Sequence, residues 1–442
     1  MTIHPVPGRS GPTVAVIGSG PSGCYTAHFL SRALPDAHIC VFESLPVPYG
    51  LVRYGIAADH QGAKAVSQQF DRIFERGHAT FVGNTRIGRD VSFEAVAQAF
   101  DVVVIATGMP EDRQLPIPRD ESARVIGAGQ VLRALNGFPA RLGRHSAPLG
   151  AAIAPLGRDI AVVGHGNVAL DTVRLLTKRP EELDGSDIDD HVLRLLRTAP
   201  LRSVHLVGRS SAGEAKFDLA MLRELCQVKG VRIRTENLHD SDPSAAADLL
   251  REFGQGDGIP DAAVHTEHPS VEEQFRTTVT IHFESIPTGI RYENAMTSLD
   301  VKCRTSGSRK AFLVDSVITA IGFCQDSDQR ADTPNASWSG VHVYRVGWVG
   351  NGAQGNLAAN RKHAQSVARR ILDDLARGSV VSGRTPGLPA ILPQLKRVPT
   401  TFSAWRVIDE FEREQAGVGR CRRKMTDLVE MVALAQTSMA NA

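Results

Sequence analysis

Two stretches of the chain share one order of apolar and polar positions. Residues 13–17 form a short β-branched run, and residues 159–163 form a similar run about 150 residues later. A glycine-containing turn follows each run, and the next residues carry apolar side chains at helical spacing, over residues 21–34 in the first case. Such runs are typical of buried parallel strands. The pattern predicts an α/β fold with two Rossmann-like dinucleotide-binding domains.

The first turn has the glycine spacing of a phosphate-binding loop. Gly18 permits a tight turn, Gly20 lets the backbone approach a pyrophosphate, and Gly23 lets the helix pack closely on the strand. The helix then begins at Pro21 and Ser22, where free N–H groups and the helix dipole attract phosphate. Alone the pattern is weak, because glycine-rich turns occur in many α/β proteins.

An acidic residue strengthens this interpretation. The next apolar run, residues 38–42, is followed by Glu43, about 25 residues after Gly18. A carboxylate at this place accepts hydrogen bonds from both hydroxyl groups of a ribose and repels a 2′-phosphate. The first site is therefore predicted to bind FAD or NAD.

The second turn has the opposite chemistry at the corresponding strand end. Ala169 takes the place of the third glycine, and the following run, residues 203–208, leads into Arg209 instead of an acid. A guanidinium there favours the 2′-phosphate of NADP, although a surface arginine would look the same in sequence. Ser210 and Ser211 are either further donors to that phosphate or turn residues. The other predicted contacts of this loop are Gly164, Gly166, Asn167 and Val168.

Two nucleotide sites of different preference on one chain imply a relay. The first site would retain a flavin, and the second would admit an exchangeable hydride donor. Helical spacing over residues 356–372, after Gly352 and Gly355, predicts a further helix whose N-terminus would face the flavin and stabilise its reduced, anionic form.

The composition of the chain argues against several classes of protein. The 442 residues, with 42% hydrophobic and 22% charged content, suit two or three soluble globular domains, and 50 basic against 48 acidic side chains give no general attraction to nucleic acid or membrane. No apolar stretch is long enough for a membrane span, and no secretory signal is recognisable. We therefore expect a cytoplasmic protein without nucleic-acid or membrane partners. Six scattered cysteines argue against a redox dithiol or a metal site.

A longer motif carries a family resemblance. Residues 46–60 read Pro-Val-Pro-Tyr-Gly-Leu-Val-Arg-Tyr-Gly-Ile-Ala-Ala-Asp-His. This segment closely resembles the adrenodoxin reductase family, whose bacterial members are ferredoxin–NADP reductases. The blocks at 164–171, 207–209 and 347–356 fit the family in the same order, and the tail at 401–422 is similar to its last helices. The resemblance covers essentially the whole chain and is weakest at about 235–310.

The resemblance implies the architecture of glutathione reductase without its interface dithiol. Residues 1–108 and 322–442, the latter with the C-terminal helices, would form a discontinuous FAD domain, and residues 109–321 an inserted NAD(P)H domain. It also implies an NADPH:ferredoxin oxidoreductase, in which a hydride passes from NADPH to flavin N5 and single electrons then pass to an acidic iron–sulfur ferredoxin.

The resemblance also assigns roles to individual residues. Glu43 would hold the adenosine ribose of FAD, and Leu51 with Arg53 would line the flavin site. His60 would lie near flavin and nicotinamide and meet Glu224 across the domain boundary, which makes these two the candidate catalytic residues, although ordinary polar roles stay open. The further implied contacts with the cofactors are Gly50, Val52, Thr107, Gly108, Trp348, Gly355, Asn356 and Leu357.

The chain departs from the family at two places. Ser210 stands where the family usually has a second arginine, which would weaken the preference for NADPH and admit NADH. Asn351 and Ala353 lie where the family usually has Arg-Gly-Pro. These departures keep two alternatives open: an FAD/NAD(P)H oxidoreductase acting directly on a small organic substrate or on oxygen, and a flavin-binding redox sensor without turnover.

An acidic ferredoxin would require a basic docking surface, and the sequence offers three candidate clusters. A basic run is more often only a solvated surface. The clusters are Arg194, Arg197 and Arg202; Arg223, Lys229, Arg232 and Arg234; and Arg420, Arg422, Arg423 and Lys424.

Two segments are predicted to be irregular: a variable connection at 235–275 and an extended strap at 378–400.

Overall fold

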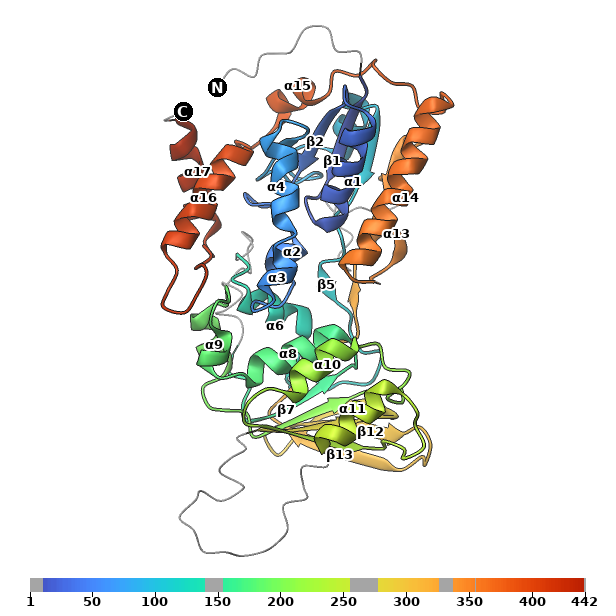
Figure 1. Cartoon of the computed structure of the whole chain (residues 1–442), viewed down its shortest axis with the longest axis vertical. Coiled ribbons are helices and arrows are strands. Elements are labelled where there is room, and N and C mark those ends of the chain that lie inside the picture. Colours follow the sequence, from blue (N-terminus) through green and yellow to red (C-terminus); the bar gives the residue numbers. More distant parts are fainter. Residues whose placement is uncertain (1–10, 140–153, 255–276, 326–336, 354, 441–442) are drawn as a thin grey trace, which may run out of the picture.

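The computed structural model describes residues 11–139, 154–254, 277–325, 337–353 and 355–440. The chain forms two layered α/β bodies, one above the other in Figure 1. Each body is built around its own parallel sheet. The predicted α/β fold with two Rossmann-like units is therefore confirmed.

The upper body contains a five-stranded parallel sheet in the order β16-β4-β1-β2-β3. Its strands alternate their side chains between two cores: Val14 and Val16 point into one with the helices α1 and α14, and Ala15 and Ile17 into the other. Strand β16 comes from near the C-terminus, so distant parts of the chain complete one sheet. The strands are β1 Thr13–Ile17, β2 His38–Phe42, β3 Thr80–Val82, β4 Val102–Ile105 and β16 Val343–Arg345.

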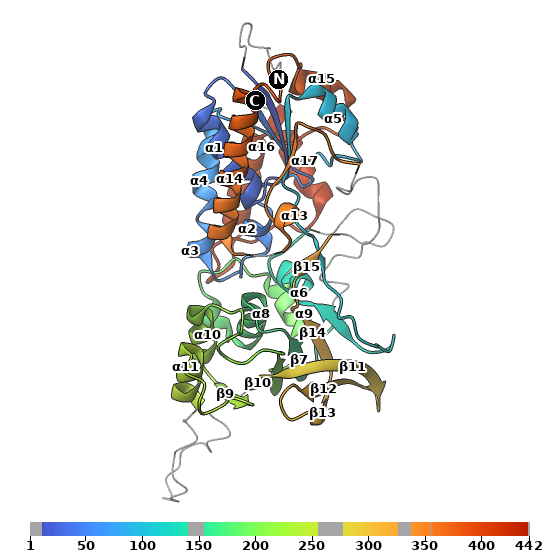
Figure 2. The ribbon, with the colours of Figure 1, turned by 90° about the vertical axis from the view of Figure 1, so that its right-hand side faces the viewer.

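Helices cover both faces of the upper sheet (Figure 2). The long helix α14 packs along α1, which brings residues from both chain ends together. The helices of this body are α1 Pro21–Ala33, α2 Leu51–Tyr54, α3 Gln61–Lys64, α4 Ser67–Glu75, α5 Phe93–Ala99, α13 Trp348–Asn351, α14 Leu357–Ala376, α15 Leu388–Ile391, the 3-10 helix η3 Leu392–Gln394, α16 Phe402–Glu414 and α17 Leu428–Ala440.

The lower body contains a six-stranded parallel sheet in the order β6-β14-β7-β8-β10-β9. Helices cover one face, and an antiparallel three-stranded sheet, β11-β12-β13, packs on the other face. The strands are β6 Val125–Gly127, β7 Asp159–Val163, β8 Ser203–Val207, β9 Val231–Glu236, β10 Thr277–His282, β11 Ser285–Glu293, β12 Met296–Cys303, β13 Arg309–Val314 and β14 Ser316–Thr319; the helices are α6 Ala128–Leu135, α8 Asn167–Thr177, η1 Pro180–Leu183, α9 Asp190–Leu196, α10 Leu219–Cys226 and α11 Ala245–Gly254.

The chain crosses between the bodies along a two-stranded antiparallel ribbon. Strand β5 Glu111–Asp112 leads down from the upper sheet and pairs with β15 Phe323–Cys324, which leads back up. Gly108 and Gly322 flank this ribbon with φ angles of 69° and 101°, a region that favours glycine. A glycine therefore stands at each crossing.

Two segments predicted to be irregular contain helices. Within the variable connection, residues 245–254 form α11, which buries Ala247, Leu249 and Leu250, and residues 255–276 lie outside the described part. The proline-containing strap includes α15 and η3, which pack against α5. In both cases helical turns were hidden by neighbouring Asp, Ser, Pro and Gly residues. No helix in the described ranges has the length and apolar character to cross a bilayer.

Candidate functional site

Two of the three glycines in the first loop occupy positions that no larger residue could take without movement. A Cβ atom on Gly18, whose φ is 110°, would lie 2.5 Å from the Ala106 carbonyl oxygen, and one on Gly23 would lie 2.0 Å from the Gly18 carbonyl oxygen. A Cβ on Gly20 would meet nothing within 4 Å. The first two glycines therefore serve packing, whereas Gly20 borders open space at the start of α1.

The N-terminus of α1 is free to receive an anion. Gly20 is its N-cap residue and provides no side-chain cap, and Pro21 has no N–H, so the first N–H groups of the helix, at Ser22 and Gly23, have no capping side chain. Such an uncapped N-terminus behind a glycine turn is the usual cradle for a pyrophosphate.

Glu43 stands at the end of β2, beside this loop. Its Oε2 atom accepts hydrogen bonds from the backbone N–H of Ser19 (3.1 Å) and from the Ser19 hydroxyl (2.6 Å), and its Oε1 accepts from the Leu45 N–H (3.1 Å). The carboxylate is half-buried and held in place next to the glycine loop. Ser19, which the sequence analysis did not single out, positions it; its place inside the Gly-Ser-Gly turn was the available signal.

The Pro-Tyr-Gly-Leu segment at residues 48–51 packs against the first glycine loop. Tyr49 adopts a φ of 82°, and its N–H donates to the Ser19 hydroxyl at 3.2 Å. Gly50 has a φ of 46°, and a Cβ there would lie 3.2 Å from the Gly20 Cα. Leu51 is half-buried at the start of α2, and Val52 is buried in the core.

The Arg53 guanidinium, predicted to line the flavin site, is paired with a carboxylate of a distant helix. The Arg53 side chain is 5% exposed and its Nη2 atom lies 2.5 and 2.6 Å from the two carboxylate oxygens of Glu412 in α16. It also stacks over the rings of Tyr54 and Trp405. Arg53 therefore ties α2 to the C-terminal helices, a distant contact that the local motif could not reveal.

Residues from the C-terminal part of the chain contact the first glycine loop at Ser22. The Ser22 hydroxyl donates to Asn360 Oδ1 of α14 at 3.0 Å, and a Cβ on Gly347 would lie 2.2 Å from the Ser22 oxygen. The indole nitrogen of Trp348 is buried and has no hydrogen-bond partner within the described residues, and its ring stacks on Phe323 at 5.2 Å.

The start of α14 is exposed near the contact between Ser22 and Asn360. Asn356 caps it by accepting from the N–H groups of Ala358 and Ala359, and Gly355 precedes it with a φ of 84°. Gly355 and Asn356 are exposed and Leu357 is half-buried. Across the sheet end, Thr107 is exposed and Gly108 is open to a Cβ.

These features fit FAD. The open Gly20, the uncapped α1 N-terminus, the fixed Glu43 carboxylate and the unpartnered Trp348 N–H together offer a pyrophosphate cradle, a ribose acceptor and a ring-side donor. The predicted contacts from both ends of the chain therefore lie at one end of the upper sheet.

The second loop repeats the geometry of the first. A Cβ on Gly164, whose φ is 133°, would lie 2.3 Å from the Ala320 carbonyl oxygen, whereas one on Gly166 would meet nothing within 4 Å. Helix α8 begins at Asn167, followed by the half-buried Val168, without a side-chain cap. The Asn167 amide exchanges two hydrogen bonds of 2.7 Å with Asp218, which closes the loop toward α10.

His165 within this loop is a packing residue. Its ring is buried against Phe283, and a Cβ on Gly208 would touch it at 2.4 Å. Burial lowers the pKa of His165 to about 4, so the ring is neutral at physiological pH.

Arg209 follows β8 and is exposed, with no ion pair to another described residue. Ser210 is half-buried, and its carbonyl oxygen accepts from the Glu284 N–H at 3.0 Å. A guanidinium at this strand end is free to bind an anion, as the NADP assignment requires.

His60 and Glu224 come together between the two bodies. The His60 Nε2 atom lies 2.8 Å from Glu224 Oε2, and its Nδ1 atom lies 3.8 Å from Asp171. His60 precedes α3 of the upper body, and Glu224 lies on α10 of the lower one. The structure thus places this pair in contact, as the resemblance implied.

A buried ionic cluster that the sequence analysis missed supports that contact. Arg174 of α8 is 1% exposed and ion-pairs with Asp59 and, at 2.8 Å, with Asp171; Lys178 bonds Asp59 at 2.7 Å. These charges hold the pKa of Asp59 below its usual value, because hydrogen bonds from both cations outweigh the effect of burial. An arginine on the apolar side of a helical pattern was the only sequence signal.

The three basic clusters differ in the exposure and ion pairing of their side chains. Arg420 and Arg422 form ion pairs with Asp190 and Asp409, and Lys424 is buried beside Asp187, so Arg423 is the one exposed member of the third cluster. In the first cluster, Arg202 pairs with Asp159 and Arg197 bonds backbone carbonyls, whereas Arg194 is exposed. In the second, Arg223 on α10, Lys229 between α10 and β9, and Arg234 on β9 are exposed, and Arg223 directly precedes Glu224.

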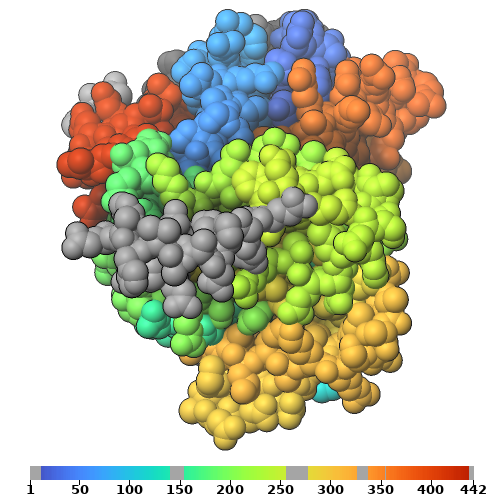
Figure 3. Space-filling view, turned by 60° about the horizontal axis from the view of Figure 1, so that its bottom comes forward, coloured from blue at the N-terminus to red at the C-terminus, as the bar shows by residue number. Residues whose placement is uncertain are grey.

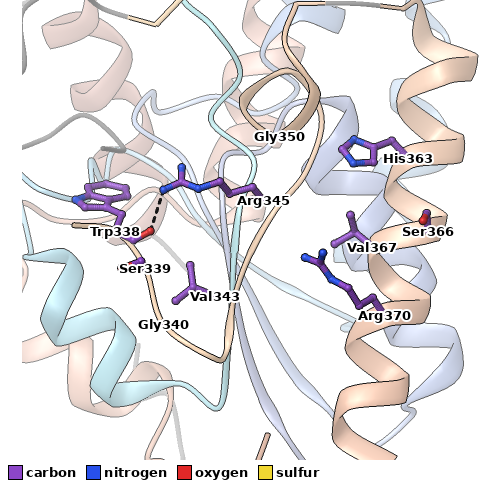
Figure 4. Close-up of a pocket in the computed structure, with 10 residues that line it drawn as sticks. All are labelled: Trp338, Ser339, Gly340, Val343, Arg345, Gly350, His363, Ser366, Val367 and Arg370. Atoms are coloured by element: carbon purple, nitrogen blue, oxygen red, sulfur yellow. Dashed lines mark hydrogen bonds between the residues drawn. The ribbon is translucent and has the colours of Figure 1, made fainter. Parts of the chain in front are cut away.

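A cavity of about 420 Å³ lies apart from both glycine loops, between β16 and α14 (Figure 4). Arg345, His363 and Arg370 point toward it, and Arg345 bonds the Trp338 carbonyl oxygen at 2.9 Å. His363 accepts the Gly347 N–H at 3.1 Å and so supports the turn before Trp348. With its amide nitrogen facing inward, Asn351 donates to the carbonyl oxygens of Gly347 and Gly352 and fixes the same turn.

Comparison with known proteins bears on these features. Residues 12–238 match the pyridine nucleotide-disulphide oxidoreductase family. Cindoxin reductase of Citrobacter braakii is 36% identical over 97% of this chain and 92% of its own length. The mitochondrial NADPH:adrenodoxin oxidoreductase of Homo sapiens is 31% identical over 96% of this chain and 92% of its own. The chain belongs to the adrenodoxin reductase family.

A solved member of the adrenodoxin reductase family has the same fold. The structure of Mycobacterium tuberculosis FprA in complex with NADPH superposes with a TM-score of 0.79, at 26% identity, over 96% of this chain and all of that one. Membership confirms the glutathione reductase-type flavoprotein architecture, with FAD and NADPH as the cofactors of the family. The six cysteines are free, and no two of them are separated by only two residues as in a Cys-X-X-Cys dithiol.

Proposed function

We propose that this chain is an FAD-dependent NADPH:ferredoxin oxidoreductase. The observation that carries the proposal is the pair of similar glycine loops with opposite end groups: Glu43 beside the first and the exposed Arg209 beside the second. One loop suits a nucleotide without a 2′-phosphate and the other a nucleotide with it. The electrons would pass to an iron–sulfur ferredoxin, in line with the names of the relatives.

When bound, FAD accepts a hydride from NADPH at N5 and releases electrons singly to an iron–sulfur protein. The chain's own residues bind and orient. Glu43 would accept the ribose hydroxyl groups, and the uncapped N-terminus of α1 would hold the pyrophosphate. His60 and Glu224 would hold the two bodies at the separation that aligns nicotinamide and flavin.

We place the domain boundaries at the two crossings. Residues 1–108 and 322–442 would form the FAD domain, and residues 109–321 the NADPH domain. The division is supported by the sheets, because β1–β4 and β16 share one sheet whereas β6–β10 and β14 share the other. We also infer a cytoplasmic location, where six free cysteines stay reduced.

The remaining site assignments form part of the same proposal. On the FAD side, Gly20, Ser22, Thr107, Trp348 and the start of α14 border the space beside the first loop. For docking of an acidic ferredoxin, we favour the second cluster, because Arg223, Lys229 and Arg234 are exposed and Arg223 directly precedes Glu224 on α10. Basic residues there would attract and orient the partner.

Anaerobic stopped-flow spectroscopy of the FAD-loaded protein tests the proposal. NADPH should bleach the flavin, and a reduced flavin mixed with an oxidised ferredoxin should regain its absorbance. No bleaching by either NADPH or NADH would refute the reductase. Bleaching followed by reoxidation with oxygen or a small quinone, but not with any ferredoxin, would instead favour the small-substrate alternative.

A further inference from the structure

A carboxylate oxygen, Glu214 Oε2, occupies a position beside the second nucleotide loop at which an anion can bind. Glu214 Oε2 accepts from the Ser211 hydroxyl at 3.1 Å and from the Ser211 N–H at 3.4 Å. The Arg304 Nη2 atom lies 3.6 Å from the same oxygen. Three donors from two separate segments therefore converge on a single carboxylate oxygen.

This position adjoins the strand end that carries Arg209. Ser211 is two residues beyond Arg209, and the turn after β10 packs on the same loop, since the Glu284 N–H donates to the Ser210 carbonyl oxygen. Arg304 lies in the turn between β12 and β13. Its guanidinium donates a hydrogen bond of 2.6 Å to Glu284 and also faces Glu214. Figure 3 shows the yellow-green surface of α10 and α11 directly beside the orange-yellow surface of the three-stranded sheet.

The two carboxylates near Arg304 differ in how firmly they are held. The Glu284 side chain is 6% exposed and is bonded by Thr305, His239 and Arg304. The Glu214 side chain is 64% exposed and makes only longer contacts from a surface turn. Glu214 is therefore free to swing away, whereas Glu284 stays as the support of Arg304.

We propose that Glu214 occupies the position of the NADPH 2′-phosphate in the nucleotide-free protein, and that Arg304 supplies the second guanidinium of the pocket in place of Ser210. The inference rests on the proposed NADPH site and names its specificity residues. The incoming phosphate would replace the Glu214 carboxylate at Ser211 and Arg304, next to Arg209. Displacement of Glu214 lowers the affinity for NADPH, so NADH remains a competitor.

Two variants with opposite expected effects test this inference in the FAD-loaded protein. Affinities for 2′,5′-ADP and for 5′-AMP are measured by calorimetry, so that turnover is not required. Glu214→Gln should raise the ratio of 2′,5′-ADP to 5′-AMP affinity, and Arg304→Ala should lower it, each by roughly tenfold, because a charge next to the phosphate is removed. Arg291→Ala is the matched control, since Arg291 is 51% exposed and also pairs with a carboxylate, Asp300.

The outcomes separate this inference from the proposed function. An unchanged ratio in Glu214→Gln would overturn it, even if Arg304→Ala failed to fold, and so would equal effects in Arg304→Ala and Arg291→Ala. If the unmodified protein bound neither 2′,5′-ADP nor 5′-AMP, the proposed NADPH site itself would be wrong. Binding of both probes, with a ratio that no variant changes, would remove only the role of Glu214 and Arg304.

Discussion

His60 of the upper body and Glu224 of the lower body lie 2.8 Å apart, joined by a hydrogen bond between residues 164 positions distant in the chain. The buried Arg174 contacts both Asp59, next to His60, and Glu224. The pair therefore connects the residue before α3 to α10, together with the other contacts between the two bodies.

Loss of this contact should slow flavin reduction. We expect His60→Gln and Glu224→Gln each to lower the rate of bleaching by NADPH about tenfold while FAD stays bound, because hydride transfer depends on ring alignment. The double variant should be no slower than the slower single one, since both remove one interaction. Stopped-flow absorbance measures all three, with the exposed His191→Gln as control. Unchanged rates in both single variants would contradict the role.

Arg209→Ala should weaken NADPH binding by roughly tenfold or more and leave NADH binding nearly unchanged, because only NADPH carries the 2′-phosphate that pairs with the guanidinium. Steady-state KM values for the two donors measure the effect. The exposed Arg234→Ala serves as control for a general loss of positive charge. Equal losses for NADPH and NADH would show that Arg209 does not recognise the phosphate.

Glu43→Gln should release FAD more readily. The neutral amide keeps the size of the side chain but loses the charged acceptor for the ribose, which we expect to cost roughly tenfold in FAD affinity. Flavin fluorescence in the filtrate after ultrafiltration measures the release. Asp36→Asn, an exposed substitution ahead of β2, is the control. Full retention of FAD by Glu43→Gln would exclude its ribose contact.

Arg53→Ala should destabilise the fold itself. Glu412 is fully buried, and removal of its main partner would leave a poorly compensated charge at a cost of about 3 kcal/mol. The replacement of both residues, Arg53→Met with Glu412→Leu, should recover part of the loss. Thermal unfolding followed by circular dichroism measures both. A single variant as stable as the unmodified chain would contradict the structural role of the ion pair.

Stability should fall in acid through His165. Its native pKa is about 4, because the ring is buried, whereas an unfolded histidine titrates near 6.5. Between these values only the unfolded chain binds the proton, so the free energy of unfolding decreases by up to about 3 kcal/mol as pH falls from about 6.5 to 4. Urea unfolding of His165→Gln should show a flatter pH profile, and identical profiles would exclude this contribution.

Local patterns were sufficient wherever the relevant contacts lie within one strand–turn–helix unit. The boundaries of β1, β2, β7 and β8 follow from their apolar runs, and the roles of Gly18 and Gly23 follow from the fixed geometry of the turn between strand and helix. The opposite end groups, Glu43 and Arg209, are equally local, since each simply follows its strand.

Contacts between distant segments could not be deduced in this way. Arg53 belongs to the diagnostic motif, yet its partner Glu412 lies 359 residues further along, and nothing in the motif distinguishes an arginine facing flavin from one facing α16. The tail at 420–424 reads as a basic run, but folding neutralises most of it with Asp184, Asp187, Asp190 and Asp409.

The sequence by itself determined the two nucleotide loops, the charge that follows each, and membership of the adrenodoxin reductase family, because these depend on neighbouring residues and a conformation that glycine permits. Only the tertiary structure decided which charges remain available for ligands. Burial and pairing remove Arg53, Arg420 and Lys424, whereas Arg209 is left exposed and Arg304 lies 3.6 Å from Glu214, the residue that Ser211 also contacts. How strongly a charge acts on a ligand depends on its burial and on its other partners, and these depend on the whole fold.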